Sequence, residues 1–170
     1  MNSKNITVAL IISIAILSRL IYHPPNFTPL FSVCIFAGMM FKQKRLMFLV
    51  PFLCMFISDL IIGLHDTLLF VYLSFTIVIL LGKTLNDNYS FSKLLGTIFA
   101  SNLIFFLITN FAVWYFQYGF YEHSIRGLLT CYYLALPFVK NSLLSNLFFT
   151  PCLIYSYKYI ENKYPIFLKT

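Results

Sequence analysis

Charged side chains are scarce in this sequence. Asp, Glu, Lys and Arg make up 10% of its 170 residues, whereas 60% are hydrophobic. A soluble domain carries about 25% charged residues, which it needs to cover its surface. The composition therefore excludes an ordinary soluble domain and a disordered chain, and it predicts an integral membrane protein.

The sequence also lacks the common catalytic and metal-binding motifs. Its four cysteines are far apart and form no C-x-x-C pair, so neither a disulfide framework nor a zinc site is expected. There is no P-loop, no H-E-x-x-H and no G-x-S-x-G. We therefore expect no metal, no cofactor and no enzymatic activity. The net charge of +7 is attributed to membrane topology rather than to nucleic-acid binding.

Long apolar runs separated by short polar turns fill the chain. Because a helix that crosses the hydrocarbon layer needs about 20 apolar residues, the length allows six crossings and no second domain. The sequence predicts an all-α integral membrane protein, a single domain over residues 1–170 that forms a six-transmembrane-helix bundle. The expected spans are 6–21, 27–41, 46–64, 68–81, 94–116 and 142–157. The run 127–139 is short and contains Pro137, so it is predicted to be a half-helix or interfacial segment.

Basic residues fall mostly on one side of this predicted topology. With the N-terminus inside, one side holds Lys4, Lys42, Lys44, Arg45, Lys83, Lys93, Lys158, Lys163 and Lys169, and the other holds Arg19, Arg126 and Lys140. Cytoplasmic loops collect Lys and Arg, so both termini are predicted to be cytoplasmic. The outer loops are then 22–26, 65–67 and 117–141.

Two ionisable residues lie within the predicted spans. Arg19 and Asp59 each lie about 20 Å from the inner boundary, at 1.5 Å per residue. A charge inside the membrane is costly, and it pairs with another charge or faces a cavity. We predict an ion pair between Arg19 and Asp59, which is either structural or part of a ligand site.

Further polar and aromatic residues gather toward the predicted outer side. A small-molecule site combines an apolar wall with a few directional polar groups. Candidate substrate-binding residues are His23, Asp59, His65, Asp66, Asn110, Trp114, His123 and Asn141. The alternatives are that the asparagines only join helices and that Trp114 is an interfacial anchor.

Five motifs resemble an uncharacterised family of small bacterial membrane proteins. They are Arg19-x-x-x-His23-Pro24-Pro25-Asn26-Phe27-Thr28-Pro29, Ser58-Asp59-Leu60-x-x-Gly63-x-His65, Thr109-Asn110-Phe111-x-Val113-Trp114, Gly127-Leu128-Leu129-x-Cys131-Tyr132 and Pro137-Phe138-x-x-Asn141. That family in turn is similar to the substrate-binding S components of energy-coupling factor (ECF) vitamin transporters. This second similarity rests on size, on six helices with both termini inside, and on Pro137-Phe138 followed by the polar Asn141 at the last helix.

The similarity to S components implies where a substrate would lie. The outer loops would cap it, with His23, Asn26, His65, Asp66 and the segment 117–126. It also implies a bacterial cytoplasmic (inner) membrane location and partnership with an ECF-type membrane coupling subunit and two ATPases. S components usually dock through Ala-x-x-x-Ala, whereas this chain has Ala9-x-x-x-Ser13. Position 2 is Asn2 rather than the His of metal-transporting relatives, so nickel or cobalt is not expected as the substrate.

The sequence therefore predicts a substrate-binding membrane subunit for uptake of a small organic, vitamin-like nutrient. One alternative is a structural or assembly membrane protein of the cell envelope without a ligand. A second is a membrane enzyme that acts at the outer face through His23, His65 and Asp66.

Overall fold

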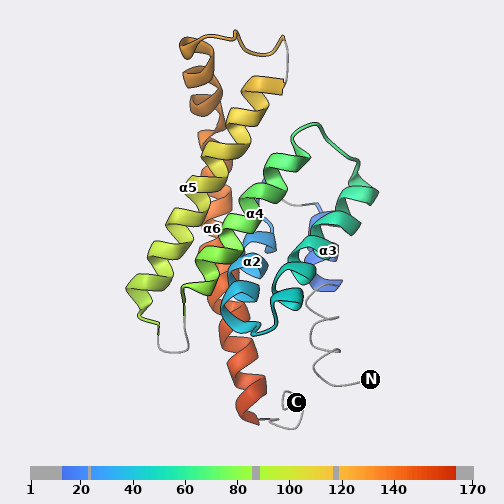
Figure 1. Cartoon of the computed structure of the whole chain (residues 1–170), viewed down its shortest axis with the longest axis vertical. Coiled ribbons are helices and arrows are strands. Elements are labelled where there is room, and N and C mark those ends of the chain that lie inside the picture. The colour runs from blue at the N-terminus through green and yellow to red at the C-terminus, as the bar shows by residue number, and fades with distance from the viewer. Residues whose placement is uncertain (1–12, 23, 86–88, 117–118, 164–170) are drawn as a thin grey trace.

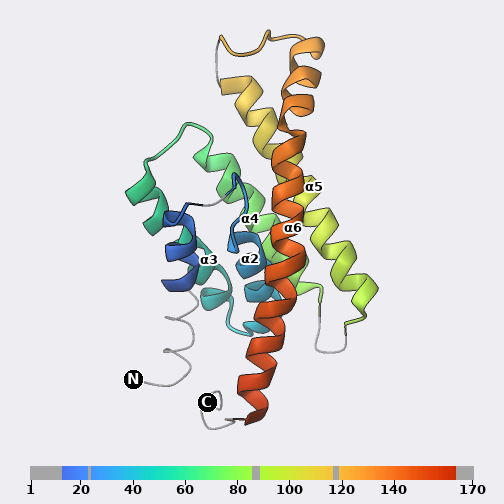
Figure 2. The same cartoon turned by 180° about the vertical axis from the view of Figure 1, so that it is seen from behind.

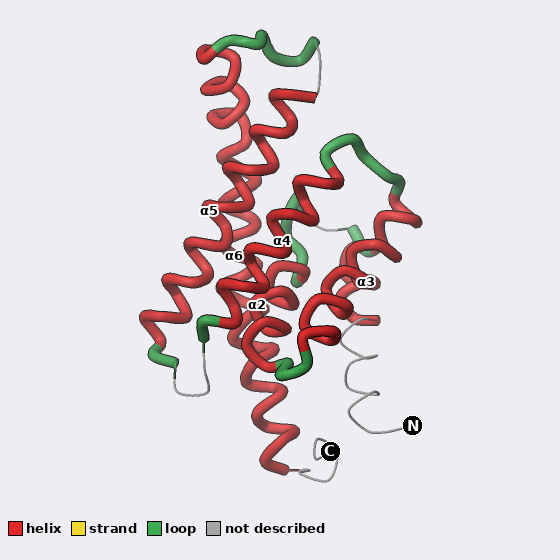
Figure 3. Tube along the Cα trace, in the orientation of Figure 1, coloured by secondary structure: helices red, strands yellow, loops and turns green. Residues whose placement is uncertain are grey.

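The protein is described here by a computed structural model, which covers residues 13–22, 24–85, 89–116 and 119–163. All regular structure in those ranges is helical, and no strand occurs there (Figure 3). A first helix is described over residues 13–20. It is followed by α2 (Leu30–Met40), α3 (Lys44–Ile62), α4 (Leu68–Lys83), α5 (Phe91–Phe116) and α6 (Ile125–Lys163).

The helices run up and down along the long axis of the molecule (Figures 1 and 2). The connections 63–67 and 119–124 lie at what we call the upper end, and the segments 41–43, 84–85 and 89–90 lie at the lower end, where α6 also finishes. Residues 24–29 lead into α2 from its upper side. The helix over 13–20 lies beside α3. The α5–α6 pair reaches farther up than the α3–α4 pair, so the upper end is stepped rather than flat.

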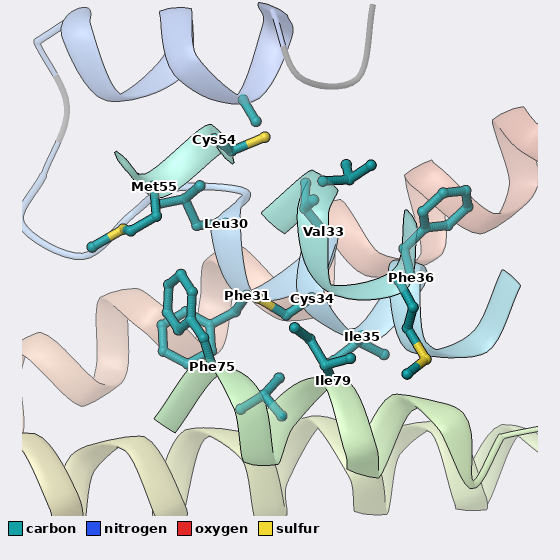
Figure 4. Close-up of a cluster of buried hydrophobic side chains, with 14 of the residues drawn as sticks. Leu30, Phe31, Val33, Cys34, Ile35, Phe36, Cys54, Met55, Phe75 and Ile79 are labelled. Atoms are coloured by element: carbon teal, nitrogen blue, oxygen red, sulfur yellow. The ribbon is translucent and has the colours of Figure 1, made fainter. Parts of the chain in front are cut away.

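Helix α2 forms the centre of the core. Its residues from Leu30 to Gly38 are all buried, because α3, α4 and α6 pack around it. Figure 4 shows Phe31 beside Phe75, and Ile35 beside Ile79, where α2 meets α4. The Phe31 ring also meets the Phe105 ring of α5 at 4.4 Å, edge to face. Aromatic edge-to-face contacts of this kind stabilise a core beyond the area they bury.

Two glycines let α2 and α4 approach until their backbones touch. A Cβ on Gly38 would overlap the carbonyl oxygen of Ile79, and a Cβ on Gly82 would overlap that of Ile35. Small residues at helix interfaces permit this close approach, which is a frequent device in membrane helices. Gly96 of α5 has open space around it and makes no comparable contact.

The predicted break between a half-helix at 127–139 and a crossing at 142–157 is wrong. The structure has one helix, α6, that passes through both Pro137 and Pro151. The polar residues read as a helix end bond instead to other elements: the Asn141 amide donates to the Pro25 carbonyl, and the Ser142 hydroxyl donates to Asn102. Proline in a helix interior removes one backbone donor, which neighbouring groups can compensate.

Several other predicted boundaries also move. Helix α2 begins at Leu30 rather than at residue 27: the chain turns at Asn26, which has φ +62°, and the first bond of the helix runs from the Val33 N–H to the Pro29 carbonyl. Helix α3 ends at Ile62 because Gly63 has φ +118°. Asp66 therefore lies in the loop beyond α3 and does not continue a helical face from Asp59. The predicted span 68–81 extends to Lys83, and the predicted span 94–116 begins at Phe91.

Helices α3 and α5 are long and apolar enough to cross a membrane, judged by length and composition. Large apolar side chains are exposed on the helix over 13–20 and on α3, α4, α5 and α6, including Leu60 at 58%, Leu103 at 56% and Phe148 at 59% of their surface. Soluble monomers rarely expose contiguous apolar patches larger than a few hundred Å². These features are coarse evidence for a membrane protein.

The glycine contact between α2 and α4 gives a first prediction. Gly38→Ala or Gly82→Ala forces the two backbones apart, and each should destabilise the protein by about 2 kcal/mol. Thermal unfolding of the detergent-solubilised protein measures this effect. Gly96→Ala is the matched control and should be neutral or slightly stabilising, because alanine favours helix over glycine. Equal stabilities for all three variants would contradict the close approach.

Candidate functional site

Arg19 and Asp59 form an ion pair in the structure. This confirms the pairing that their equal predicted depth in the membrane indicates. Arg19 Nη1 lies 2.7 Å from Asp59 Oδ1, and it also donates to the Ser58 hydroxyl at 2.6 Å. The Met55 sulfur is 3.1 Å from the same nitrogen. Asp59 is 1% exposed and Arg19 16%. The ion pair is thus almost dehydrated and ties the first helix to α3.

One oxygen of this carboxylate keeps no hydrogen-bond partner among the described residues. Asp59 Oδ2 and the Tyr72 hydroxyl of α4 are both buried and unpaired there, and an electrostatic interaction connects the two groups. Buried polar atoms are normally satisfied, and an unpaired one costs about 1–3 kcal/mol. Because the Tyr72 hydroxyl is a donor that interacts with Asp59, a small shift of either side chain would pair it with Oδ2.

The larger cavity lies between α5, α6 and the loop that precedes α2. Its volume is about 350 Å³. Aromatic side chains and amides line it together, among them Asn26, Asn102, Phe105, Phe106, Asn110 and Tyr121. Burial raises the pKa of the Tyr121 phenol above its usual value, with a smaller contribution from the nearby Cys131 thiol. The phenol is therefore a neutral hydrogen-bonding group at physiological pH.

A smaller cavity of about 190 Å³ lies between the first helix, α2, α3, α4 and α5. Its polar lining comes from Arg19, Asn26, Thr28 and His65. The His65 ring Nδ1 is 3.0 Å from the Thr67 hydroxyl, which fixes the ring in the loop between α3 and α4. Asn26 and Phe105 line both cavities, so the two spaces adjoin at these residues.

The loop that carries Asn26 is tied to α6. Asn141 Nδ2 donates to the Pro25 carbonyl at 3.0 Å, and the Ser145 hydroxyl donates to the Thr28 carbonyl at 2.7 Å. Asn26 itself has the left-handed backbone that asparagine tolerates better than most residues. Its side chain makes no hydrogen bond to another described residue, and it lies at the junction of the two cavities.

A buried polar network forms the floor of the larger cavity. Asn102 Oδ1 accepts from the Ser142 hydroxyl at 2.7 Å and from Asn146 Nδ2 at 3.3 Å. The Ser32 hydroxyl donates to Asn146 Oδ1 and accepts from Thr150, both at 3.0 Å. The network joins α2, α5 and α6. It fixes the distance between the walls of the cavity above it.

Trp114, in the last turn of α5, and His123, in the connection that leads to α6, form a separate cluster. Trp114 Nε1 donates to the Glu122 carbonyl at 2.9 Å, and its ring centroid is 5.3 Å from that of His123. The Ser124 hydroxyl caps the start of α6 by accepting from the Gly127 N–H. Neither Trp114 nor His123 lines either cavity.

Comparison with protein families gives one match. Residues 1–167 match a family described as a family of unknown function, DUF6580. The chain belongs to the DUF6580 family. No curated protein and no solved structure was found to match it.

The nine candidate binding residues are thus dispersed in the DUF6580 chain. Asn26, His65 and Asn110 line the cavities, and Asn141 holds the loop that bears Asn26. Asp59 orients Arg19 without lining a cavity itself. Asp66 is exposed, and Trp114 and His123 stabilise the α5–α6 connection. His23 lies outside the described residues. In the part of the chain that is described, no three His, Cys, Asp or Glu side chains come together as a metal site.

Several cavity residues of the DUF6580 chain were not among the candidates. Phe105 lines the larger cavity, and Ser142 joins its floor to Asn102. Tyr121 also lines this cavity, and it belongs to the segment 117–126 that the similarity to S components implied. Phe105 carries no sequence signal beyond its apolar run. Ser142 does, because Ser145 and Asn146 follow it by three and four residues, which is the spacing of a polar stripe on one continuous helix.

The Arg19–Asp59 pair gives a second prediction. Arg19→Met leaves a buried carboxylate and Asp59→Leu leaves a buried guanidinium, so each should destabilise the protein by about 3 kcal/mol. The double variant removes both charges and should be more stable than either single variant. Unfolding free energies in detergent, compared in a double-mutant cycle, measure the coupling. Additive losses would show that the two charges do not interact.

Proposed function

We propose that this DUF6580 chain is a six-helix membrane protein that binds a small organic nutrient for uptake. Its upper end would face outward and its lower end the cytoplasm. The observation that carries the proposal is the pair of adjoining cavities at the upper end, whose walls are apolar and whose few polar groups come from different elements. Ligand sites between the helices of a bundle have this character.

The distribution of charge supports this orientation. The described basic residues of the lower end are Lys42, Lys44, Arg45, Lys83, Lys93, Lys158 and Lys163, whereas Arg19, Arg126 and Lys140 are the described basic residues of the upper part. Positive charge accumulates on the cytoplasmic side of membrane proteins. The exposed apolar side chains between the two ends provide a surface suited to lipid.

The short helix α2 is compatible with a membrane setting. Eleven residues span about 16 Å, roughly half of a hydrocarbon layer. Non-helical backbone at membrane depth is tolerated where protein buries it or where it lines a cavity. The segment before α2 meets that condition, because α6 side chains bond its carbonyls and Asn26 borders both cavities.

The partners in this proposal come from the resemblance to S components of ECF transporters. The chain would present its bound substrate to a membrane coupling subunit, and two ATPases would supply the energy. Binding rather than catalysis is its part in the process. The substrate is proposed to be vitamin-like in size, which agrees with cavities of about 350 and about 190 Å³.

A ligand-free structural or assembly protein is the second candidate. It is favoured by the buried network of Asn102, Ser142 and Asn146, whose polar atoms bond one another between α5 and α6. Asparagines in membrane helices often serve only this purpose. The two candidates differ at Asn110 and His65, because these side chains face cavities at the upper end rather than a neighbouring helix.

Native mass spectrometry of protein purified gently from its own host tests the proposal. A bound small molecule should be detected on the wild type. Asn110→Ala and His65→Ala should each lower its occupancy about tenfold, the value of one lost hydrogen bond.

Asn162→Ala is the matched control, because Asn162 is exposed near the end of α6, far from both cavities. It should keep full occupancy. A wild-type protein that carries no small molecule would overturn the proposal and favour the structural candidate.

A further inference from the structure

The charge of the cavity lining indicates what kind of molecule fits. No Asp or Glu lines either cavity, although Asp59 lies close behind Arg19. The lining residues with basic side chains are Arg19 and His65, both in the smaller cavity. The smaller cavity therefore offers N–H donors from a guanidinium and an imidazole, and donors of this kind favour an anionic partner over a cationic one.

Arg19 retains donors for such an anion. Its contacts with Asp59, Ser58 and Met55 all use Nη1. Nε and Nη2 donate no hydrogen bond to another described residue, and the side chain borders the cavity. Asp59 thus positions the guanidinium while leaving part of its donor fork available. A fork of this kind binds carboxylate or phosphate oxygens in pairs.

The larger cavity has a different chemistry. Phe105 and Phe106 give it aromatic walls, and Asn110 and Tyr121 give it polar edges. Asn110 Nδ2 donates to the Phe106 carbonyl, which leaves its amide oxygen as an acceptor. This combination suits a planar ring that carries hydrogen-bonding groups on its edge.

We propose that the two cavities together hold one elongated organic anion. Its carboxylate or phosphate would lie by Arg19 and His65, and its ring would lie between Phe105, Phe106 and Asn110. Asn26 lies at the junction and contacts the part of the molecule that carries the negative charge. This inference rests on the proposed function and narrows its substrate class.

Substitutions of Asn26 can test the proposed anion without disturbing the loop, because the left-handed backbone of Asn26 restricts the choice to residues that tolerate it. Glycine and aspartate also adopt φ near +62°, so Asn26→Gly and Asn26→Asp preserve the loop. Asn26→Gly removes the amide only. Asn26→Asp keeps the shape of the side chain and adds a negative charge at the junction. The ion pair of Arg19 is left intact in both variants.

The experiment is mass spectrometry of all small molecules that denaturation releases from the purified wild type and variants, expressed in the native host. The wild type should release one compound that ionises as an acid and contains a ring. Asn26→Asp should lower its amount per protein at least about tenfold, because like charges a few Å apart repel. Asn26→Gly should lower it less. Asn162→Asp adds the same charge at the lower end and should change nothing.

Each result decides a separate point. The elemental formula of the released acid distinguishes a phosphate from a carboxylate. The proposal of an anionic ligand would be wrong if the released compound were neutral or basic. It would also be wrong if Asn26→Asp and Asn26→Gly retained the compound equally. Either result would leave the proposed nutrient-binding function in place. No released compound from the wild type would overturn both.

Discussion

Buried polar groups must find partners, and this constraint shapes the upper half of the bundle. Asn141, Ser142, Ser145 and Asn146 of α6 bond to the segment before α2, to α5 and to α2 itself. Inside a low-dielectric core such bonds are strong, and their loss is costly. They hold the loop with Asn26 against α6 and keep Asn102 at the floor of the larger cavity. The cavity walls are therefore fixed by hydrogen bonds rather than by apolar packing alone.

The lower half relies on a different constraint, the close contact of α2 with α4 through Gly38 and Gly82. Dense packing there places Phe31 and Phe75 against Phe105, whose ring borders both cavities. The Arg19–Asp59 pair adds the first helix to this frame and points part of a guanidinium into the smaller cavity. Phe105 and Arg19 thus have two roles: they stabilise the helix bundle, and they line the cavities in which a ligand is proposed to bind.

The sequence predicts the positions of the helices more accurately than the residues at which they end. It also predicts the Arg19–Asp59 ion pair more accurately than the set of residues that line the cavities. Apolar runs located all six described helices, and equal depth paired Arg19 with Asp59. The break before residue 142 was predicted wrongly because Pro137 and the polar residues after it look like a helix end, whereas their side chains bond to other segments. The site was only partly predictable. Asn26, His65 and Asn110 do line cavities, but Trp114 and His123 contact each other where α5 meets the α5–α6 connection, a tertiary relation that spacing along one helix does not reveal.

The account makes one central claim, that the adjoining cavities at the upper end are a ligand site. A structure of the protein in lipid nanodiscs, purified from its own host, tests it most directly. The account predicts non-protein density that passes Asn26 and runs from Arg19 to Asn110. Cavities filled by the chain's own side chains, with the network around Asn102 unchanged, would contradict it and identify the polar residues as a means of joining helices.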